Sequence, residues 1–238
     1  MSVECVAIVV AFGGGARFGG AVSKQFVDLG GLPVLGHSLL AFERVLAVRR
    51  VVLVAGDCPP HFGDCPRGWR GWFEEIGISK PVEVISGGAT RQQSVFAAVK
   101  MLESEGFSGI VLVHDAARPF VDARAVDEVL MAAKRHGAAT LGTSVTDTIK
   151  VSDGGMIIET LPREMLYRVQ TPQAFQAELL YRAHNEADGL EVYDDCQLVE
   201  KIGISPRIVA GSPLNIKITH EIDLGLAREI LKIRKENV

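Results

Sequence analysis

Short apolar runs rich in Val and Ile alternate along the first part of the chain with longer stretches in which apolar residues recur at helical spacing. The runs predict buried strands over 3–10, 51–55, 82–85, 110–113 and 139–145, and the stretches between them predict helices over 33–46, 90–105 and 122–136. Strands of this kind separated by helices are typical of a parallel sheet covered on both faces. We therefore expect a doubly wound α/β fold with a mostly parallel sheet.

Two helix ends carry specific sequence signals. Thr90 and Gln93 stand at the spacing of a capping box, which predicts a helix that begins after Thr90. Gly137 follows the predicted helix over 122–136 and suits its C-terminal cap. Residues 57–73 contain turn residues followed by aromatic ones, and they predict no particular element.

The pattern changes after residue 145. Two short runs, 148–151 and 156–160, flank the tetrapeptide Ser-Asp-Gly-Gly, which predicts a β-hairpin of the kind that often serves as a dimerisation arm. Beyond it the pattern predicts helices over 177–186, 195–202 and 221–235 and strands over 207–209 and 216–218. No linker or repeat interrupts the chain, so we expect a single domain over 1–238 with an arm at about 146–170.

Composition narrows the class of protein. The 238 residues carry a formal net charge of −4 and no stretch dense in Lys and Arg, so small molecules are the expected partners and nucleic acid is not. No apolar run approaches the length that crosses a bilayer, so no membrane contact is expected. The N-terminus has no basic region, and the cysteines at 5, 58, 65 and 196 lack zinc-site spacing. These features predict free thiols in a cytoplasmic protein.

Three predicted strands are followed by residues suited to binding a ligand. Glycines 13–15 follow the first strand, GGATR follows the strand over 82–85, and HDAARP begins at the end of the strand over 110–113. Because ligands of doubly wound sheets bind beyond the carboxyl ends of the strands, we expect these three segments to form one site.

The glycine loop does not match two common phosphate-binding motifs. A dinucleotide-binding loop needs a third glycine where Phe18 stands, and a P-loop needs Lys and then Ser or Thr where Gly20 and Ala21 stand. What remains is Gly-x-Gly-x-Arg17, with Lys24 seven residues further on. Glycine N–H groups and two cations would suit a polyphosphate on which charge builds during a reaction. A glycine-rich turn with two solvated charges fits the loop equally well.

A series of motifs resolves this ambiguity. G-x-G-x-R, SKQF, GGATRQQSV, VHDAARPF, DTIK, QTPQAF and NIKIT follow one another between residue 6 and about residue 230. In this order they resemble the 2-C-methyl-D-erythritol 4-phosphate cytidylyltransferase family. The first motif is shared with sugar nucleotidyltransferases, whereas HDAARPF, QTPQAF and NIKIT are more specific to this family.

The resemblance implies a nucleotidyltransferase fold whose β-arm forms a homodimer. The implied reaction is attack of the methylerythritol phosphate oxygen on the α-phosphorus of CTP, with release of pyrophosphate and a requirement for Mg²⁺, in the non-mevalonate route to isoprenoids. A phosphate is already a competent nucleophile, so positioning and charge stabilisation carry the rate and no strong general base is needed.

The resemblance also implies roles for individual residues. Arg17 and Lys24 would stabilise the pentavalent phosphorus, and the Asp115 carboxylate would face Mg²⁺, a cation that prefers oxygen ligands. Arg163 and Lys217 complete the set of predicted catalytic residues.

Two further groups of residues would bind the substrates. CTP would be contacted by Ala11, Gly13, Gly14, Gly15, Gly88, Ala89, Ser94 and Ala117. Methylerythritol phosphate would be held by Thr171 and Lys217 together with Thr148 and Arg163, the last two reaching in from the arm of the partner.

Neighbouring residues have structural explanations. Thr90 and Ser94 fit a helix N-terminus, Arg118 a brace that binds backbone carbonyls, His114 a buried structural histidine and Asp223 an acid at a helix start. Arg91 fits a solvated helix residue and a site residue equally well. Asp115, Lys24 and Lys217 each end an element with no evident partner in the sequence, which favours functional roles.

Three positions depart from the family pattern. Phe12 stands where a small residue is usual, Ser23 where proline precedes the lysine, and Tyr193 where threonine is frequent. Phe12 and Ser23 keep open a non-catalytic nucleotide-binding relative. Similar glycine, KQF and arginine-proline motifs keep open a ribitol 5-phosphate or other polyol-phosphate cytidylyltransferase.

Overall fold

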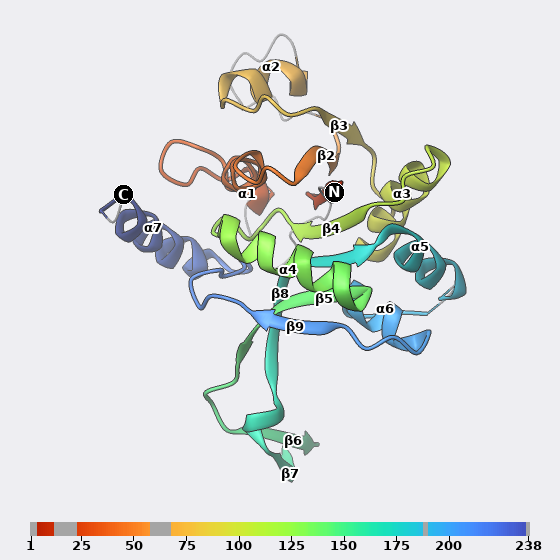
Figure 1. Cartoon of the computed structure of the whole chain (residues 1–238). Helices are drawn as coiled ribbons and strands as arrows, with labels where there is room; N and C mark the ends of the chain where they lie inside the picture. The colour runs from red at the N-terminus through yellow and green to blue at the C-terminus, as the bar shows by residue number, and fades with distance from the viewer. Residues whose placement is uncertain (1–3, 12–22, 58–67, 188–189, 237–238) are drawn as a thin grey trace.

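The computed structural model describes residues 4–11, 23–57, 68–187 and 190–236. Its centre is a seven-stranded sheet with the order β3-β2-β1-β4-β8-β5-β9 (Figure 1). The strands of this sheet are β1 Cys5–Val10, β2 Val48–Val54, β3 Val82–Ile85, β4 Ile110–Asp115, β5 Ala138–Ser144, β8 Tyr167–Gln176 and β9 Arg207–Ala210. Within this sheet, only β8 runs antiparallel to its neighbours among the described pairings, so the mostly parallel sheet is confirmed.

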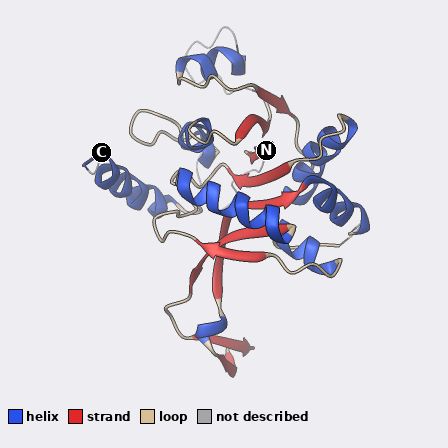
Figure 2. Cartoon of the chain, viewed as in Figure 1, coloured by secondary structure: helices blue, strands red, loops and turns tan. Residues whose placement is uncertain are grey.

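Helices cover both faces of the sheet (Figure 2). The helices are α1 Val34–Glu43, α2 Gly68–Glu75, α3 Arg91–Ser104, α4 Ala123–His136, α5 Ala177–Glu186, α6 Asp195–Lys201 and α7 Glu221–Glu236, with short 3-10 turns η1 Lys24–Phe26 and η2 Arg163–Met165. Side chains of α1, α2 and α4 join the core on one face, and those of α3, α5 and α6 join the core on the other.

The strand β1 shows why its sequence is apolar at every position. Ala7 and Val9 face the core beneath α1 and α4, whereas Val6 and Ile8 face the core beneath α3 and α5. All six residues of the strand are buried. A strand with helices on both sides has no solvent face, so an unbroken apolar run is required.

Local capping fixes where α3 and α4 begin and end. The Thr90 side chain accepts from the Gln93 N–H and the Gln93 side chain reaches back to the Thr90 N–H, which confirms the predicted capping box. Asp122 caps the start of α4, and Gly137 ends it with φ at 85°, a left-handed conformation that favours glycine.

The structure corrects one predicted element and adds two that were not predicted. Residues 216–218 form no strand; instead the Ile218 N–H donates to the Ala117 carbonyl, and its buried side chain packs with α7. The helix α2 lies in the segment for which no element was predicted. The strand β8 was missed because its polar side chains are buried: Gln173 is fully buried and donates to Asp194.

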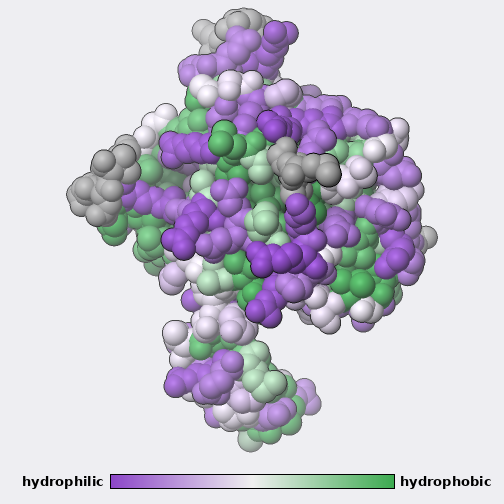
Figure 3. Space-filling view, in the orientation of Figure 1, coloured by the Kyte–Doolittle hydropathy of each residue, from purple (hydrophilic) through white to green (hydrophobic). Residues whose placement is uncertain are grey.

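The predicted hairpin is present as β6 Ile149–Asp153 and β7 Met156–Leu161, joined at Gly154 and Gly155, both with positive φ. It extends away from the sheet beyond the ends of β5 and β8 (Figure 1). Met156, Ile157 and Ile158 are at least 65% exposed, and Figure 3 shows apolar surface on this protruding part of the molecule. The arm is therefore paired within itself but leaves large apolar side chains uncovered.

The thiol prediction is confirmed for Cys5 and Cys196, which are buried and unpaired, whereas Cys58 and Cys65 lie outside the described residues. Burial raises the pKa of both described thiols. None of the helices in the described ranges is long and apolar enough to cross a membrane.

Candidate active site

The sheet order reverses beside β1, because the chain proceeds outward to β2 and β3 and then returns to place β4 on the other side. The register pairs Val10 with Asp115, so β1 and β4 end at the same level. This is the position at which doubly wound sheets bind ligands. The carboxyl ends of β1, β3 and β4, after which the predicted segments begin, therefore lie at one edge of the sheet.

Asp115 lies at the end of β4 and binds two cations. Its Oδ1 accepts from Arg91 Nε at 2.9 Å, and its Oδ2 accepts from Lys217 Nζ at 2.6 Å. Only 11% of the carboxylate side chain is exposed. The expectation that Asp115 and Lys217 lack partners is thus wrong, because each is the partner of the other, and Arg91 belongs to the same cluster instead of being a solvated helix residue.

The ion-paired cluster continues into the protein. Arg91 Nη1 donates to Asp195 Oδ2 at 2.7 Å, and the Asp195 side chain is 1% exposed. His184 of α5 places Nε2 3.3 Å from Asp195 Oδ1 without hydrogen-bonding geometry, and its ring stacks on Phe96 at 5.1 Å. Asp195 and His184 were not among the predicted site residues.

Fixed charges determine the ionisation of this cluster. Burial alone would raise the pKa of Asp115, but the positive charges of Arg91 and Lys217 outweigh it and hold the pKa well below its usual range. Burial likewise opposes ionisation of Asp195, and Arg91 reverses the effect so that the pKa of Asp195 is lowered. Both carboxylates are therefore anions at neutral pH, and the cluster alternates in sign from Lys217 to Asp195.

Thr171 and His114 support the Asp115 backbone. The Thr171 hydroxyl accepts from the Asp115 N–H at 3.1 Å and lies 3.1 Å from His114 Nδ1. His114 Nε2 lies 3.1 Å from the Arg118 carbonyl oxygen, and burial lowers the pKa of His114 to about 4. In a neutral ring, Nδ1 accepts a hydrogen bond from the Thr171 hydroxyl and Nε2 donates one to the Arg118 carbonyl, so both nitrogens are satisfied. This confirms the structural interpretation of His114.

Arg118 and Asp223 also have the structural roles expected of them. Arg118 donates to the Asn215 carbonyl at 2.9 Å and to the Val169 carbonyl at 3.4 Å, so it braces the loop after β4 against two other segments. The Asp223 carboxylate accepts from the N–H groups of Thr219 and His220, both at 2.8 Å, at the start of α7.

The loop between β3 and α3 is held by its own side chains. The Gly88 N–H donates to Ser94 Oγ at 3.1 Å, and the Ala89 N–H donates to Gln93 Oε1 at 2.9 Å. Ser94 is fully buried and also donates to the Thr90 carbonyl at 2.8 Å. A side chain at Gly88 would place Cβ 2.5 Å from Gln93 Cβ, so this close approach explains the glycine.

Lys24 begins η1 next to a residue that is tied to β1. Gln25 is buried, and its Nε2 donates to the Ala11 carbonyl at 2.7 Å, which brings this turn to the carboxyl end of β1. Ser23 precedes Lys24 with φ at −60°, the value that a proline would impose. The backbone before Lys24 therefore already has the conformation expected of the family's proline.

The structure unites some of the predicted site residues and separates others. Asp115, Thr171 and Lys217 are in contact or share a hydrogen-bond network, and Ala117 lies in the loop that follows Asp115. Thr148 and Arg163 lie in the arm, where Arg163 Nη1 donates to the Thr146 carbonyl at 3.1 Å. Arg17, the glycines 13–15 and Phe12 lie outside the described residues.

Asp115 has the chemistry of a Mg²⁺ ligand but does not form a metal site by itself. Mg²⁺ is usually held by one or two carboxylates together with substrate phosphates. The described ranges contain no group of three or more His, Cys, Asp or Glu side chains that could hold a metal. Asp115 therefore fits the role of a single protein ligand to Mg²⁺, with a phosphorylated substrate as the source of further oxygen ligands. Mg²⁺ would compete with Arg91 and Lys217 for the Asp115 oxygens.

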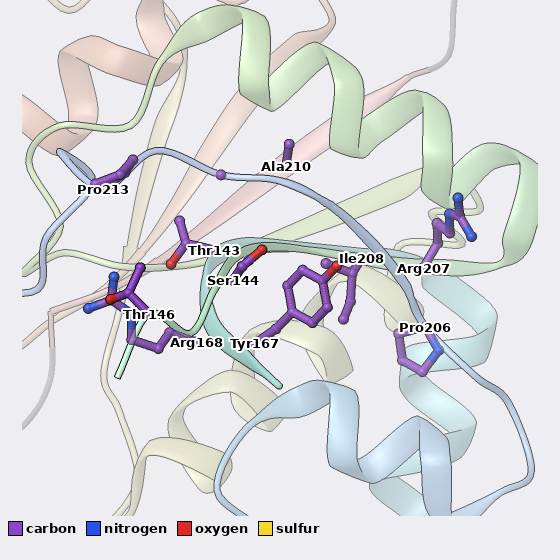
Figure 4. Close-up of a pocket in the computed structure, with 12 residues that line it drawn as sticks. Thr143, Ser144, Thr146, Tyr167, Arg168, Pro206, Arg207, Ile208, Ala210 and Pro213 are labelled. Carbon is purple, nitrogen blue, oxygen red and sulfur yellow. The ribbon is translucent and has the colours of Figure 1, made fainter. Parts of the chain in front are cut away.

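A cavity of about 740 Å³ lies at the base of the arm, between β5, β8 and β9 (Figure 4). Arg168, Tyr167 and Ile208 line it, and none of the predicted site residues does. It is separate from the Asp115 cluster and supplies no support for the predicted site.

A doubly wound sheet with an ion-paired cluster beside its switch point defines an α/β protein with a candidate ligand site at this edge. Residues 5–233 match the family model described as 2-C-methyl-D-erythritol 4-phosphate cytidylyltransferase, and the chain belongs to this family. The enzyme of that name from Pelotomaculum thermopropionicum is 40% identical over 240 residues, which cover 98% of this chain and 96% of the relative.

Two solved structures extend the comparison. 2-C-methyl-D-erythritol 4-phosphate cytidylyltransferase from Thermus thermophilus is 34% identical, with a TM-score of 0.71 and coverage of 98% of this chain and 100% of the other. 4-Diphosphocytidyl-2C-methyl-D-erythritol synthase from Anaerococcus prevotii is 28% identical, with a TM-score of 0.81 and 97% coverage of both chains. The predicted family and fold are thus confirmed.

Proposed function

We propose that this chain is a single-domain enzyme that transfers CMP from CTP to 2-C-methyl-D-erythritol 4-phosphate in non-mevalonate isoprenoid biosynthesis. The observation that carries the proposal is the cluster of Lys217, Asp115 and Arg91 at the end of β4, in a chain of this family. A buried anion that fixes a partly exposed ammonium at a strand edge suits recognition of a phosphate monoester.

In the proposed reaction a phosphate oxygen of methylerythritol phosphate attacks the α-phosphorus of CTP. The bond from this phosphorus to the bridging oxygen breaks, and that oxygen leaves with the pyrophosphate. The role of Arg17 and Lys24 is to neutralise charge on the pentavalent phosphorus. Lys217 and Thr171 orient the attacking phosphate, and no side chain has to remove a proton from it.

Cytosine recognition is assigned to carbonyl oxygens of the loop between β3 and α3. The N–H groups of Gly88 and Ala89 are engaged by Ser94 and Gln93, so they are not available to a base. Carbonyl oxygens accept from the amino group of cytosine but not from the carbonyl that uracil has at this position. Ser94 would then contribute to CTP binding by holding the backbone of this loop in place. Ala11, Ala117 and the glycines 13–15 would contact the rest of CTP.

Mg²⁺ is proposed to accompany CTP, with Asp115 as its protein ligand. The metal would supply positive charge to the triphosphate and favour departure of pyrophosphate. Lys217, the second partner of the Asp115 carboxylate, is 39% exposed, so its ammonium can contact a bound phosphate while it stays paired with Asp115.

A homodimer is proposed to complete the site. Thr148 and Arg163 belong to the arm, and 56% of the Arg163 side chain is exposed in the single chain. The uncovered apolar side chains of the arm give a second copy a surface to pack against. Thr148 and Arg163 of the partner subunit would then contact the methylerythritol phosphate. A cytoplasmic location stays a prediction from the sequence.

Pyrophosphate release from purified protein, Mg²⁺ and CTP tests the function. Methylerythritol phosphate and ribitol 5-phosphate are supplied separately, and UTP replaces CTP as a nucleotide control. We expect release with CTP and methylerythritol phosphate. Release with ribitol 5-phosphate alone would favour the polyol-phosphate alternative, and CTP binding without release would favour the non-catalytic one.

A further inference from the structure

Asp195 is a buried carboxylate that, within the described ranges, is connected to the predicted site through Arg91. Its Oδ2 accepts from Arg91 Nη1 at 2.7 Å, and its backbone N–H donates to Gln173 Oε1 at 3.2 Å. Gln173 lies in β8 and also donates from Nε2 to Asp194, the residue that caps α6. The first turn of α6 is thus fixed against the sheet, and the Asp195 carboxylate is fixed with it.

Arg91 divides its guanidinium between two carboxylates. Nη1 binds Asp195, while Nε binds Oδ1 of Asp115 at 2.9 Å. A planar guanidinium with several N–H groups can make both bonds at once, which a lysine ammonium does less well. Arg91 thus reaches one oxygen of Asp115, through Nε, and the other oxygen accepts from Lys217.

We propose that Asp195 is a positioning residue that reserves Oδ2 of Asp115 for Lys217. When the charge of Asp195 is removed, Arg91 turns to bind both oxygens of Asp115, the bidentate geometry that arginine and carboxylate favour. Lys217 then loses its anchor. The effect on turnover rests on the proposed function, whereas the effect on the Lys217 amine does not.

The amine is tested directly by chemical labelling. Asp195→Asn removes one charge, and Glu200→Gln removes one from the exposed end of the same helix as a matched control. Brief acylation followed by mass spectrometry reports the reactivity of Lys217. We expect labelling of Lys217 to rise about threefold to fivefold in Asp195→Asn, as for loss of an ion pair, and to stay at the wild-type rate in the control.

Kinetics supply the second readout. Asp195→Asn should raise the KM for methylerythritol phosphate and lower kcat/KM by about 10-fold to 10²-fold, with the KM for CTP little changed. In a Lys217→Met background, Asp195→Asn should lower kcat/KM almost no further, because the effect of Asp195 on turnover passes through Lys217.

Three results would overturn the proposal. The first is unchanged labelling of Lys217 in a folded Asp195→Asn protein. The second is a double variant whose loss in kcat/KM is the product of the two single losses. The third is an equal rise in the KM for CTP and the KM for methylerythritol phosphate in Asp195→Asn. If circular dichroism shows that the Asp195→Asn protein is not folded, Asp195→Ser is used instead. It removes the same charge and introduces a residue that suits a helix start. Failure of both to fold would assign Asp195 to stability alone. An inactive wild type with the expected labelling would instead reject the proposed function.

Discussion

The Asp115 carboxylate is 11% exposed and bound by two cations, whereas the Arg163 side chain lies on the arm with 56% of its surface exposed. The first is fixed by residues from β4, α3 and the segment before α7 of the same chain. The second contacts only its own arm among the described residues. One half of the proposed site is therefore preorganised within a single chain, and we propose that a second copy supplies the other half.

The largest effect is expected at the turn that follows β1. Lys24→Ala should lower kcat by about 10²–10³, the typical cost of losing one positioned charge at a transition state. CTP affinity should change much less, because the ground-state triphosphate keeps its other contacts.

Tryptophan fluorescence can measure that affinity. Both tryptophans of the chain, Trp69 and Trp72, lie in α2, and the Trp69 ring is 6.2 Å from Phe26 in the same turn as Lys24. Lys100→Ala, at a lysine of α3, is the control. A Lys24→Ala protein with wild-type turnover would remove Lys24 from the proposed mechanism.

A charge introduced on the exposed apolar side chains of the arm should affect dimer formation and leave the fold of the single chain intact. Ile158→Asp places a carboxylate on a side chain that is 65% exposed in the single chain, so the fold should be retained. The dimer should be lost and activity should fall at least about tenfold, because burying an unpaired charge opposes association. Analytical ultracentrifugation measures the mass. Met131→Asp, on the exposed face of α4, is the matched control, and a dimeric Ile158→Asp protein would show that this face is not the interface.

A smaller effect is expected from protonation of His114. Burial lowers its pKa from 6.5 to about 4, so the unfolded chain binds the proton first as the pH falls. This stability contribution is complete above pH 6.5 and is lost toward pH 4, by roughly 3 kcal/mol.

Thermal unfolding between pH 4 and 7 tests this contribution. His114→Gln should flatten the dependence on pH, whereas His136→Gln, at an exposed position, should leave it as in the wild type. A wild-type protein equally stable at pH 4.5 and pH 7 would contradict a buried neutral His114.

The smallest effect is expected at Ser23. Its φ of −60° is already that of proline, so Ser23→Pro should be accommodated and should stabilise the fold by about 0.4–1 kcal/mol through the unfolded chain. Urea unfolding measures the change. Destabilisation would mean that the Ser23 N–H is needed for a hydrogen bond.

Residues with local signals were predicted well from the sequence. Thr90 caps a helix through a residue three positions away, and His114, near the end of β4, contacts the Arg118 carbonyl four residues further on. The partners of Asp115 and Arg91 could not be predicted in this way, because Lys217 lies 102 residues from Asp115 and Asp195 lies 104 residues from Arg91. The strand β8 was not predicted because several of its buried residues are polar, whereas hydrophobic periodicity identifies a buried strand by its apolar residues.

Mixing two inactive chains tests most directly whether the two halves of the site come from different copies. Lys217→Met and Arg163→Ala are co-expressed with different tags, and the mixed dimer is purified. One of its two sites then has both residues intact, so we predict about half of wild-type turnover from the mixed dimer, although each homodimer is nearly inactive. A mixed dimer as inactive as its parents would contradict a site shared between two copies.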